Sequence, residues 1–193
     1  MDEPEPILRV ARLGDEAQIR VLMQASTAAI FPQYYDAVQT ASCLRYLAQP
    51  DPALVADSTY FVFEAEDELV GCGGWSRRGR PYMGSADAPD DDRLLDPLTE
   101  AAHIRAMFVR PDRTRRGLGR RIIDACEAAA RSHGFTRLDL VATLPGVPLY
   151  RACGFAAAGP VAPIVLADGV FLPCLAMTKP LDAAKGATGD DDG

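Results

Sequence analysis

The sequence lacks any long apolar run, which excludes an ordinary membrane-spanning helix. No stretch approaches the ~20 consecutive apolar residues that such a helix needs. The first residues, Met-Asp-Glu-Pro-Glu-Pro, also lack the basic and apolar regions of a secretory signal peptide. We therefore expect a cytoplasmic protein that does not act at a membrane.

Cysteine pairs at metal-binding spacing are also missing. The cysteines are odd in number and include no C-x-x-C pair, which argues against a disulfide framework or a zinc knuckle. We expect buried, reduced thiols and no bound metal. The five positions are Cys43, Cys72, Cys126, Cys153 and Cys174. Cys153 alone lies near the reaction centre considered below, and no adjacent residue is an obvious base that would activate it as a nucleophile.

The chain is acidic overall, but positive charge is concentrated in one region. The 193 residues carry a formal net charge of −7, and 48% of them are hydrophobic, as in a single domain that buries a core. Arginine at a helix start opposes the helix dipole, so a local cluster favours a bound anion. Nucleic acid is a poorer interpretation, because the chain as a whole is acidic. The clustered residues are Arg105, Arg110, Arg113, Arg115, Arg116, Arg120 and Arg121.

Residues 103–134 predict a strand, a glycine-containing loop and a helix. The strand-like run ends at Pro111, which cannot donate to a sheet ladder. Beyond the loop, residues recur at spacings of three and four, as on one helical face. They are Leu118, Ile122, Cys126, Ala129 and His133. A loop of this kind presents free backbone amides and the positive end of the helix dipole, which suits phosphate oxygens.

Two familiar phosphate loops do not fit this segment. A Walker loop ends in Gly-Lys-Ser/Thr, whereas Gly119 is followed by Arg120 and Arg121. A dinucleotide-binding loop needs a glycine three residues after Gly119, where this chain has Ile122.

A third phosphate loop does fit. Residues 114–119, Thr-Arg-Arg-Gly-Leu-Gly, resemble the Gln/Arg-x-x-Gly-x-Gly/Ala loop that binds the pyrophosphate of acyl-CoA in the GNAT superfamily of N-acyltransferases. Thr114 departs from the usual first residue. Residues 149–155, Leu-Tyr-Arg-Ala-Cys-Gly-Phe, are similar to the Leu-Tyr-x-x-x-Gly-Phe segment of the same family. Thr143 and Gly146 stand where many relatives have Asn-x-x-Ala.

The resemblance covers about residues 7–180 and implies a fold. This is a mixed α/β (α+β) domain with a mostly antiparallel central sheet of about seven strands and about four flanking helices. A splayed parallel pair of strands would admit the pantetheine arm. We expect a single acetyltransferase domain over residues 1–181 and a disordered tail over 182–193, which are small, glycine-rich and acidic.

The patterns of the chain predict the individual elements. We expect strands at 7–11, 59–65, 69–75, 136–143, 161–166 and 171–178, with helices from Asp15 to before Pro32 and at 36–48. Asp168-Gly169 predicts a hairpin between the last two strands. Residues 77–99 are longer than an ordinary connection and predict a mobile excursion.

The resemblance also implies acetyl-CoA as co-substrate. Its pantetheine would pair with the main chain of a strand, and its pyrophosphate would lie over the loop. The implied binding residues are Met107, Phe108, Val109, Thr114, Arg115, Arg116, Gly117, Leu118, Gly119 and Arg120.

Tyr150 resembles the family tyrosine whose hydroxyl can protonate the departing thiolate. The alternative is a tyrosine that caps the core with its hydroxyl in water. The rings of Phe31, Tyr34 and Tyr35 either pack the junction of two helices or border the acceptor pocket.

His103 is the candidate for the general base. Strand alternation would place it on one face with Arg105, Met107 and Val109. Relatives often carry a carboxylate at this position, and histidine titrates near neutrality. A surface role for the histidine remains open, as do Glu100 or an ordered water chain as the base.

The predicted function is transfer of an acetyl group from acetyl-CoA to a primary amine, by direct attack without a covalent enzyme intermediate. Two alternatives remain: an acyl-CoA-binding sensor without turnover, and transfer of a longer acyl chain. The acceptor, a small molecule or a peptide, is not specified, and neither is the choice between monomer and homodimer.

Overall fold

The computed structural model describes residues 5–80 and 92–181. The middle of the predicted excursion, residues 81–91, and the whole predicted tail, residues 182–193, lie outside the described residues. The mobility of the excursion and the disorder of the tail therefore stay predictions.

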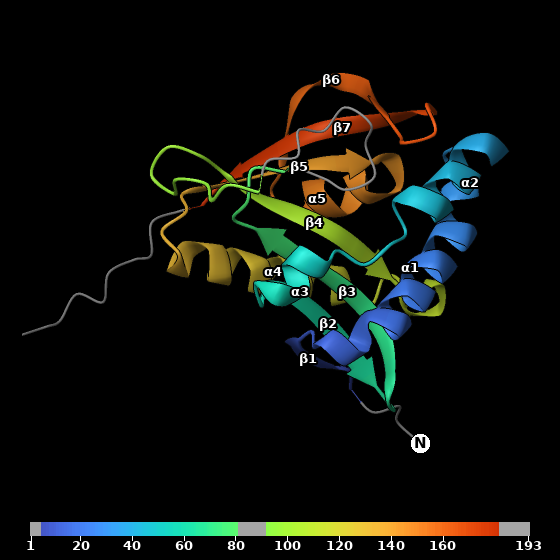
Figure 1. Cartoon of the computed structure of the whole chain (residues 1–193), viewed down its shortest axis with the longest axis horizontal. Helices are drawn as coiled ribbons and strands as arrows, with labels where there is room; N and C mark the ends of the chain where they lie inside the picture. Colours follow the sequence, from blue (N-terminus) through green and yellow to red (C-terminus); the bar gives the residue numbers. More distant parts are fainter. Residues whose placement is uncertain (1–4, 81–91, 182–193) are drawn as a thin grey trace, which may run out of the picture.

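A mixed sheet forms the centre of the described chain (Figure 1). Its seven strands follow the order β1-β2-β3-β4-β5-β7-β6, and only β4 and β5 are parallel neighbours. The strands are β1 (Ile7–Val10), β2 (Tyr60–Ala65), β3 (Glu68–Ser76), β4 (Ala102–Val109), β5 (Arg137–Thr143), β6 (Ala156–Val165) and β7 (Phe171–Pro180). The predicted architecture is confirmed.

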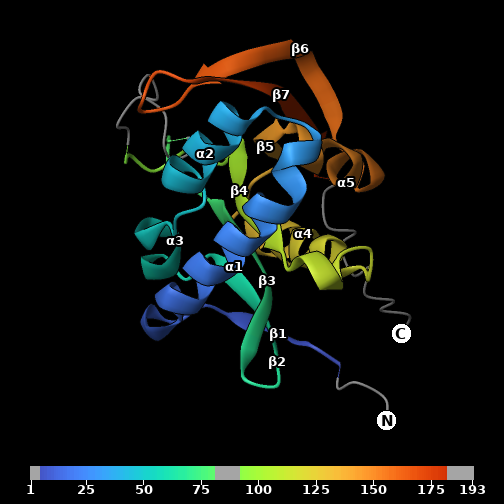
Figure 2. The ribbon, with the colours of Figure 1, turned by 90° about the vertical axis from the view of Figure 1, so that its right-hand side faces the viewer.

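Helices cover both faces of this sheet. On one face lie α1 (Glu16–Ile30), α2 (Ala37–Tyr46) and α3 (Pro52–Ala56), whose buried residues pack in two apolar clusters. Figure 2 looks onto this face, with α1 lying diagonally across the strands. On the other face, α4 (Leu118–Ser132) and α5 (Val147–Ala152) share the largest cluster. No helix was predicted from the sequence at α3.

Helix α4 confirms the predicted apolar stripe. Leu118, Ile122 and Cys126 are buried against the sheet. His133, the predicted last member of the stripe, is instead exposed at the helix end. Gly134 adopts a φ of 85°, and its N–H donates to the carbonyl of Arg131. This left-handed glycine ends the helix as the sequence indicated.

Strands β4 and β5 separate after a short parallel contact. Ala102 pairs with Leu138 and His103 pairs with Asp139, and the pairing goes no further. Beyond this point β4 continues beside β3, and β5 continues beside β7 to Thr143. The edges of β4 and β5 that face each other therefore leave main-chain groups without a ladder partner, as the family resemblance implied.

A β-bulge interrupts β4 close to this separation. Arg105 and Phe108, three positions apart, pair with Gly74 and Cys72, which are two positions apart. The extra residue lies at Ala106, whose φ is 53°. A bulge of this kind reverses the alternation of side chains beyond it.

The bulge corrects one prediction. Met107 and Val109 pack with the α4 cluster, whereas Ala106 packs with the α1 cluster. Ile104, before the bulge, also packs with the α4 cluster, so its neighbours His103 and Arg105 point to the opposite face. The prediction that His103, Arg105, Met107 and Val109 share one face is wrong.

Gly74 of β3 offers a test of packing near the bulge. A Cβ at this position would lie 2.5 Å from the main-chain oxygen of Thr59 and 2.7 Å from Cδ2 of Tyr60. Because the backbone oxygen cannot move without disturbing β2, we expect Gly74→Ala to lower the free energy of unfolding by about 1–3 kcal/mol. Gly159→Ala, at a strand position with nothing within 4 Å of the added Cβ, is the control. Urea unfolding measures both, and equal midpoints would contradict the prediction.

Candidate active site

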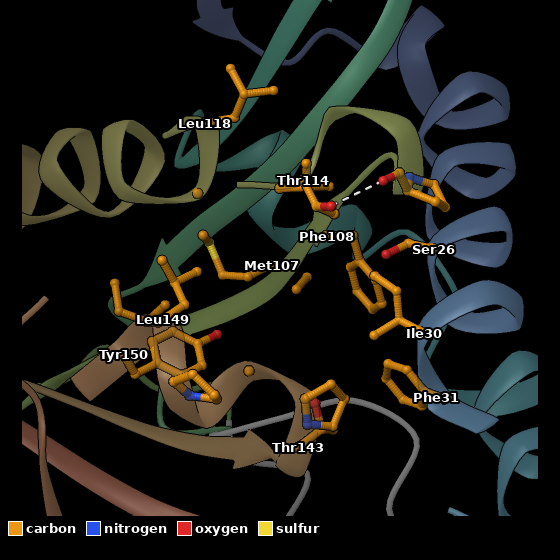
Figure 3. Close-up of a pocket in the computed structure, with 18 of the residues that line it drawn as sticks. Ser26, Ile30, Phe31, Met107, Phe108, Thr114, Leu118, Thr143, Leu149 and Tyr150 are labelled. Atoms are coloured by element: carbon orange, nitrogen blue, oxygen red, sulfur yellow. Dashed lines mark hydrogen bonds between the residues drawn. The ribbon is translucent and has the colours of Figure 1, made fainter. Parts of the chain in front are cut away.

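A cavity of about 780 Å³ opens where β4 and β5 separate. Met107 and Val109 line it from the α4 side of the sheet, and Arg105 and Phe108 line it from the other side. Because residues of both faces contribute, the cavity passes through the sheet. Figure 3 shows its walls, with the start of α4 on one side and α1 on the other.

The first turn of α4 forms one end of this cavity. Gly117, the N-cap residue, adopts a φ of 83°, and the first helical bond of this turn runs from the N–H of Arg121 to the carbonyl of Gly117. The N–H groups of Leu118, Gly119 and Arg120 precede that bond and find no main-chain acceptor among the described residues. They add to the positive end of the helix dipole, so this end of the cavity suits an anion.

Nine of the ten predicted cofactor-binding residues line the cavity. They are Met107, Phe108, Val109, Thr114, Arg115, Gly117, Leu118, Gly119 and Arg120. Arg116 is not among the lining residues. The hydroxyl of Thr114 donates to the carbonyl of Pro111 over 3.0 Å, which ties the loop to the end of β4 (Figure 3).

The predicted arginine cluster divides in the structure. Arg113, Arg115 and Arg120 line the cavity at the α4 end. In contrast, Arg110 pairs with Asp112 and Glu68 outside the cavity. Arg121 also lies outside it, where its guanidinium contacts Glu5 over 2.9 Å and stacks on the ring of Phe63. Only part of the cluster therefore faces a possible ligand.

Tyr150 lies in the wall of the cavity, and its hydroxyl points inward (Figure 3). The side chain is 8% exposed and its ring packs against Phe155. Burial raises the pKa of the Tyr150 hydroxyl well above its usual value. The hydroxyl therefore keeps its proton at neutral pH and can donate it.

Gly146 leaves space for this ring. A Cβ at residue 146 would lie 2.9 Å from Cε2 of Tyr150. The glycine at this position thus lets the tyrosine ring lie close to the preceding turn.

His103 lies outside the main cavity. It lines a separate cavity of about 150 Å³ with Asp139 and Ala158, and the two cavities share Val141 as a wall. Burial lowers the pKa of the His103 ring, while the charge of Asp139 acts in the opposite direction. The role of His103 as general base stays a prediction.

The lowered pKa of His103 predicts a dependence of stability on pH. The unfolded chain takes up a proton near the ordinary pKa of 6.5, above the pH at which the folded protein does so. The stability that is present above about pH 6.5 is therefore lost as the pH falls through the pKa of His103 in the folded protein. We expect His103→Gln to lose less stability than the wild type between about pH 7 and about pH 5. His133→Gln, at the second of the two histidines, is the control, and urea midpoints are the measurement. Equal losses of stability in wild type and His103→Gln would contradict the lowered pKa of His103 in the folded protein.

Glu100, the other candidate base, pairs with Arg93 over 2.6 Å on the surface. Hydrogen bonding from Arg93 lowers the pKa of the Glu100 carboxyl to about 2. Glu100 does not line the cavity. It is therefore poorly placed to collect a proton from a ligand there.

Comparison with known families decides the class of protein. A family model described as the acetyltransferase (GNAT) family matches residues 22–155. The chain belongs to the GNAT acetyltransferase family. The matched residues include both the glycine loop and the tyrosine segment that the sequence predicted.

Solved structures share the GNAT fold at low sequence identity. A GCN5-related N-acetyltransferase from Rhodopseudomonas palustris has a TM-score of 0.68 and 20% identity, covering 94% of this chain and 99% of that chain. PaiA N-acetyltransferase from Thermoplasma acidophilum, solved with coenzyme A, has a TM-score of 0.64 and 12% identity, covering 92% and 99%. YncA from Salmonella typhimurium, solved with its cofactor acetyl-CoA, has a TM-score of 0.60 and 18% identity, covering 95% and 99%. No curated protein matches the sequence.

The GNAT cavity includes a charged pair that the sequence analysis missed. Asp51, at the start of α3, and Arg105, in β4, approach to 2.5 Å, with side chains 3% and 4% exposed. Burial lowers the pKa of Arg105, and Asp51 partly offsets this effect. One signal was available, because an aspartate followed by Pro52 is typical of a helix start.

The aromatic residues between α1 and α2 take different positions in the GNAT domain. Phe31 and Tyr34 line the cavity, as one of the two predictions allowed. Tyr35 is buried away from it. Its hydroxyl donates to the carbonyl of Pro173 over 2.9 Å and accepts from the N–H of Leu144 over 2.8 Å. It therefore packs the junction.

The cysteines of the GNAT domain are all free and buried, as predicted. Cys153 does not line the cavity, and burial raises the pKa of its thiol. It is therefore a poor nucleophile. Among the described residues, no group of three or more His, Cys, Asp or Glu is arranged to hold a metal ion. None of the described helices is long and apolar enough to span a bilayer.

Proposed function

We propose that this GNAT protein transfers an acetyl group from acetyl-CoA to a primary amine. The observation that carries the proposal is one continuous cavity, which runs from the first turn of α4, past the Tyr150 hydroxyl, to the side covered by α1. The structural neighbours solved with coenzyme A or acetyl-CoA support the choice of co-substrate.

The α4 end of the cavity fits the diphosphate of the co-substrate. The N–H groups of Leu118, Gly119 and Arg120 supply donors, and the nearby arginines supply charge. From there, the β4 edge that β5 leaves open offers main-chain groups at Met107–Val109 to the amides of pantetheine. The thioester would then lie beside Tyr150.

The reaction needs orientation, a base and an acid. The amine nitrogen, once deprotonated, attacks the thioester carbon, an N–C bond forms and the C–S bond breaks. The Tyr150 hydroxyl gives its proton to the departing sulfur, and the proton that the nitrogen loses as the amide forms restores the hydroxyl. His103 remains the proposed base, and a proton reaching it from the main cavity must pass the wall at Val141.

Release of free thiol from acetyl-CoA in the presence of a panel of primary amines tests this proposal. We expect release that depends on the amine, together with an acetylated product detected by mass spectrometry. Binding of acetyl-CoA without amine-dependent release would instead indicate a sensor. A series of acyl-CoAs of increasing length in the same assay would identify a preference for a longer acyl group.

A further inference from the structure

Charge is unevenly distributed along the cavity. Among the described lining residues, Arg113, Arg115 and Arg120 lie at the α4 end, where the proposed diphosphate accounts for them. The remaining charged lining residues are Asp51 and Arg105. They come from α3 and from the face of β4 that α1 covers, on the proposed acceptor side.

Arg105 has more hydrogen-bonding capacity than its protein partner uses. Its Nη2 contacts Oδ2 of Asp51 at 2.5 Å, and no other ion-pair partner appears among the described residues. The second oxygen of Asp51 accepts the N–H of Ala53 and so caps α3. A guanidinium carries five N–H donors in a planar fork that matches a carboxylate. Arg105 therefore has donors left for an anionic group in the cavity.

The same pair argues against a polycationic acceptor. Asp51 is the only acidic residue among the described residues that line the cavity, and Arg105 already neutralises it. A polyamine or an aminoglycoside would need several unpaired carboxylates. The remaining wall on this side is largely apolar, with Ile30, Phe31, Leu47, Phe108 and Val141.

We propose that the acceptor is a free α-amino acid with an apolar side chain. Arg105 binds its carboxylate, Asp51 fixes the orientation of the guanidinium, and the apolar wall accommodates the side chain. The α-amine remains free to attack the thioester with the same bond changes as above. This inference rests on the proposed function and specifies its substrate class.

Matched acceptors test the inference. L-leucine, L-leucinamide and isoamylamine share a side chain and an amine, but only leucine has a carboxylate. The corresponding methionine and phenylalanine sets cover larger side chains. With acetyl-CoA saturating, we expect kcat/KM for the best amino acid to exceed that for its amide and its amine by about 100-fold or more. The N–H donors of Arg105 that Asp51 does not use stay without a charged acceptor when either analogue binds.

Variants of Asp51 and Arg105 test whether this pair causes the preference for the free acid. Arg105→Lys keeps the charge but loses the planar fork. The double variant Asp51→Asn with Arg105→Gln removes both charges, so neither is left buried without its partner. We expect the double variant to lose the preference for the free acid while its Kd for acetyl-CoA stays within about threefold of wild type, which shows that the fold is intact.

Each outcome has a defined meaning. Equal or better turnover of the amide or amine by the wild type would overturn the inference while leaving the acetyltransferase proposal standing. So would a double variant that keeps the acid preference. If no amine is turned over, calorimetry of N-acetyl-L-leucine and N-acetyl-L-leucinamide on the CoA-loaded protein decides. Binding of N-acetyl-L-leucine alone supports the carboxylate site although the catalytic proposal fails. Binding of neither ligand overturns both the carboxylate site and the catalytic proposal.

Discussion

Replacing Tyr150 with phenylalanine is expected to lower kcat by about 100-fold or more, the usual contribution of a general acid. The substitution removes the only atom proposed to protonate the leaving sulfur and keeps the ring that packs against Phe155. Affinity for acetyl-CoA should change little, because the proposed diphosphate contacts lie at the start of α4. Steady-state kinetics and calorimetry measure the two quantities separately.

A control variant and the pH dependence of activity test the role of Tyr150 further. Tyr46→Phe, at a tyrosine that does not line the cavity, should match the wild type. Because burial raises the pKa of Tyr150, wild-type activity should not fall through ionisation of this hydroxyl as the pH rises toward about 10, the usual tyrosine pKa. An unchanged kcat in Tyr150→Phe would remove the tyrosine from the chemistry.

The second large effect is expected at Gly119. Gly119→Asp would place a negative charge in the first turn of α4, where the proposed diphosphate binds. We expect the Kd for acetyl-CoA to rise about 100-fold, through repulsion in a partly buried site. Folding should suffer little from the charge itself, since an acidic residue is favourable at a helix N-terminus.

Gly119→Asn separates charge from size. A Cβ at residue 119 would lie 2.8 Å from Cδ2 of Leu149, so both variants must displace that flexible side chain. Only the aspartate adds charge, and its extra loss of affinity should shrink as salt is added. Equal dissociation constants for the two variants would mean that the start of α4 does not bind an anion.

Local sequence signals predicted much of the fold. The apolar stripe of α4, Gly134 at its end and the Asp168-Gly169 hairpin each depend on neighbouring residues, and the structure confirms them. In the hairpin, Gly169 has a φ of 84° and its N–H donates to the carbonyl of Leu166. The glycine loop and Tyr150 were likewise predicted from short motifs, and both line the cavity.

Features that depend on distant parts of the chain were not predicted. The bulge at Ala106 is fixed by pairing with β3 and by the hydroxyl of Tyr60, which donates to the Ala106 carbonyl over 2.9 Å. Strand alternation therefore placed His103 on the wrong face relative to Met107. The pair of Asp51 and Arg105 joins α3 to β4, two elements that are distant in the sequence, and α3 is too short to show helical periodicity.

The most direct test of the central claim is calorimetric titration with coenzyme A and with pantetheine, which lacks the diphosphate. We expect coenzyme A to bind in a one-to-one complex. The affinity for pantetheine should be lower by about 100-fold or more, because pantetheine cannot accept the charge-assisted hydrogen bonds from the first turn of α4. No binding of coenzyme A, or equal affinity for the two ligands, would contradict the assignment of this cavity to an acyl-CoA.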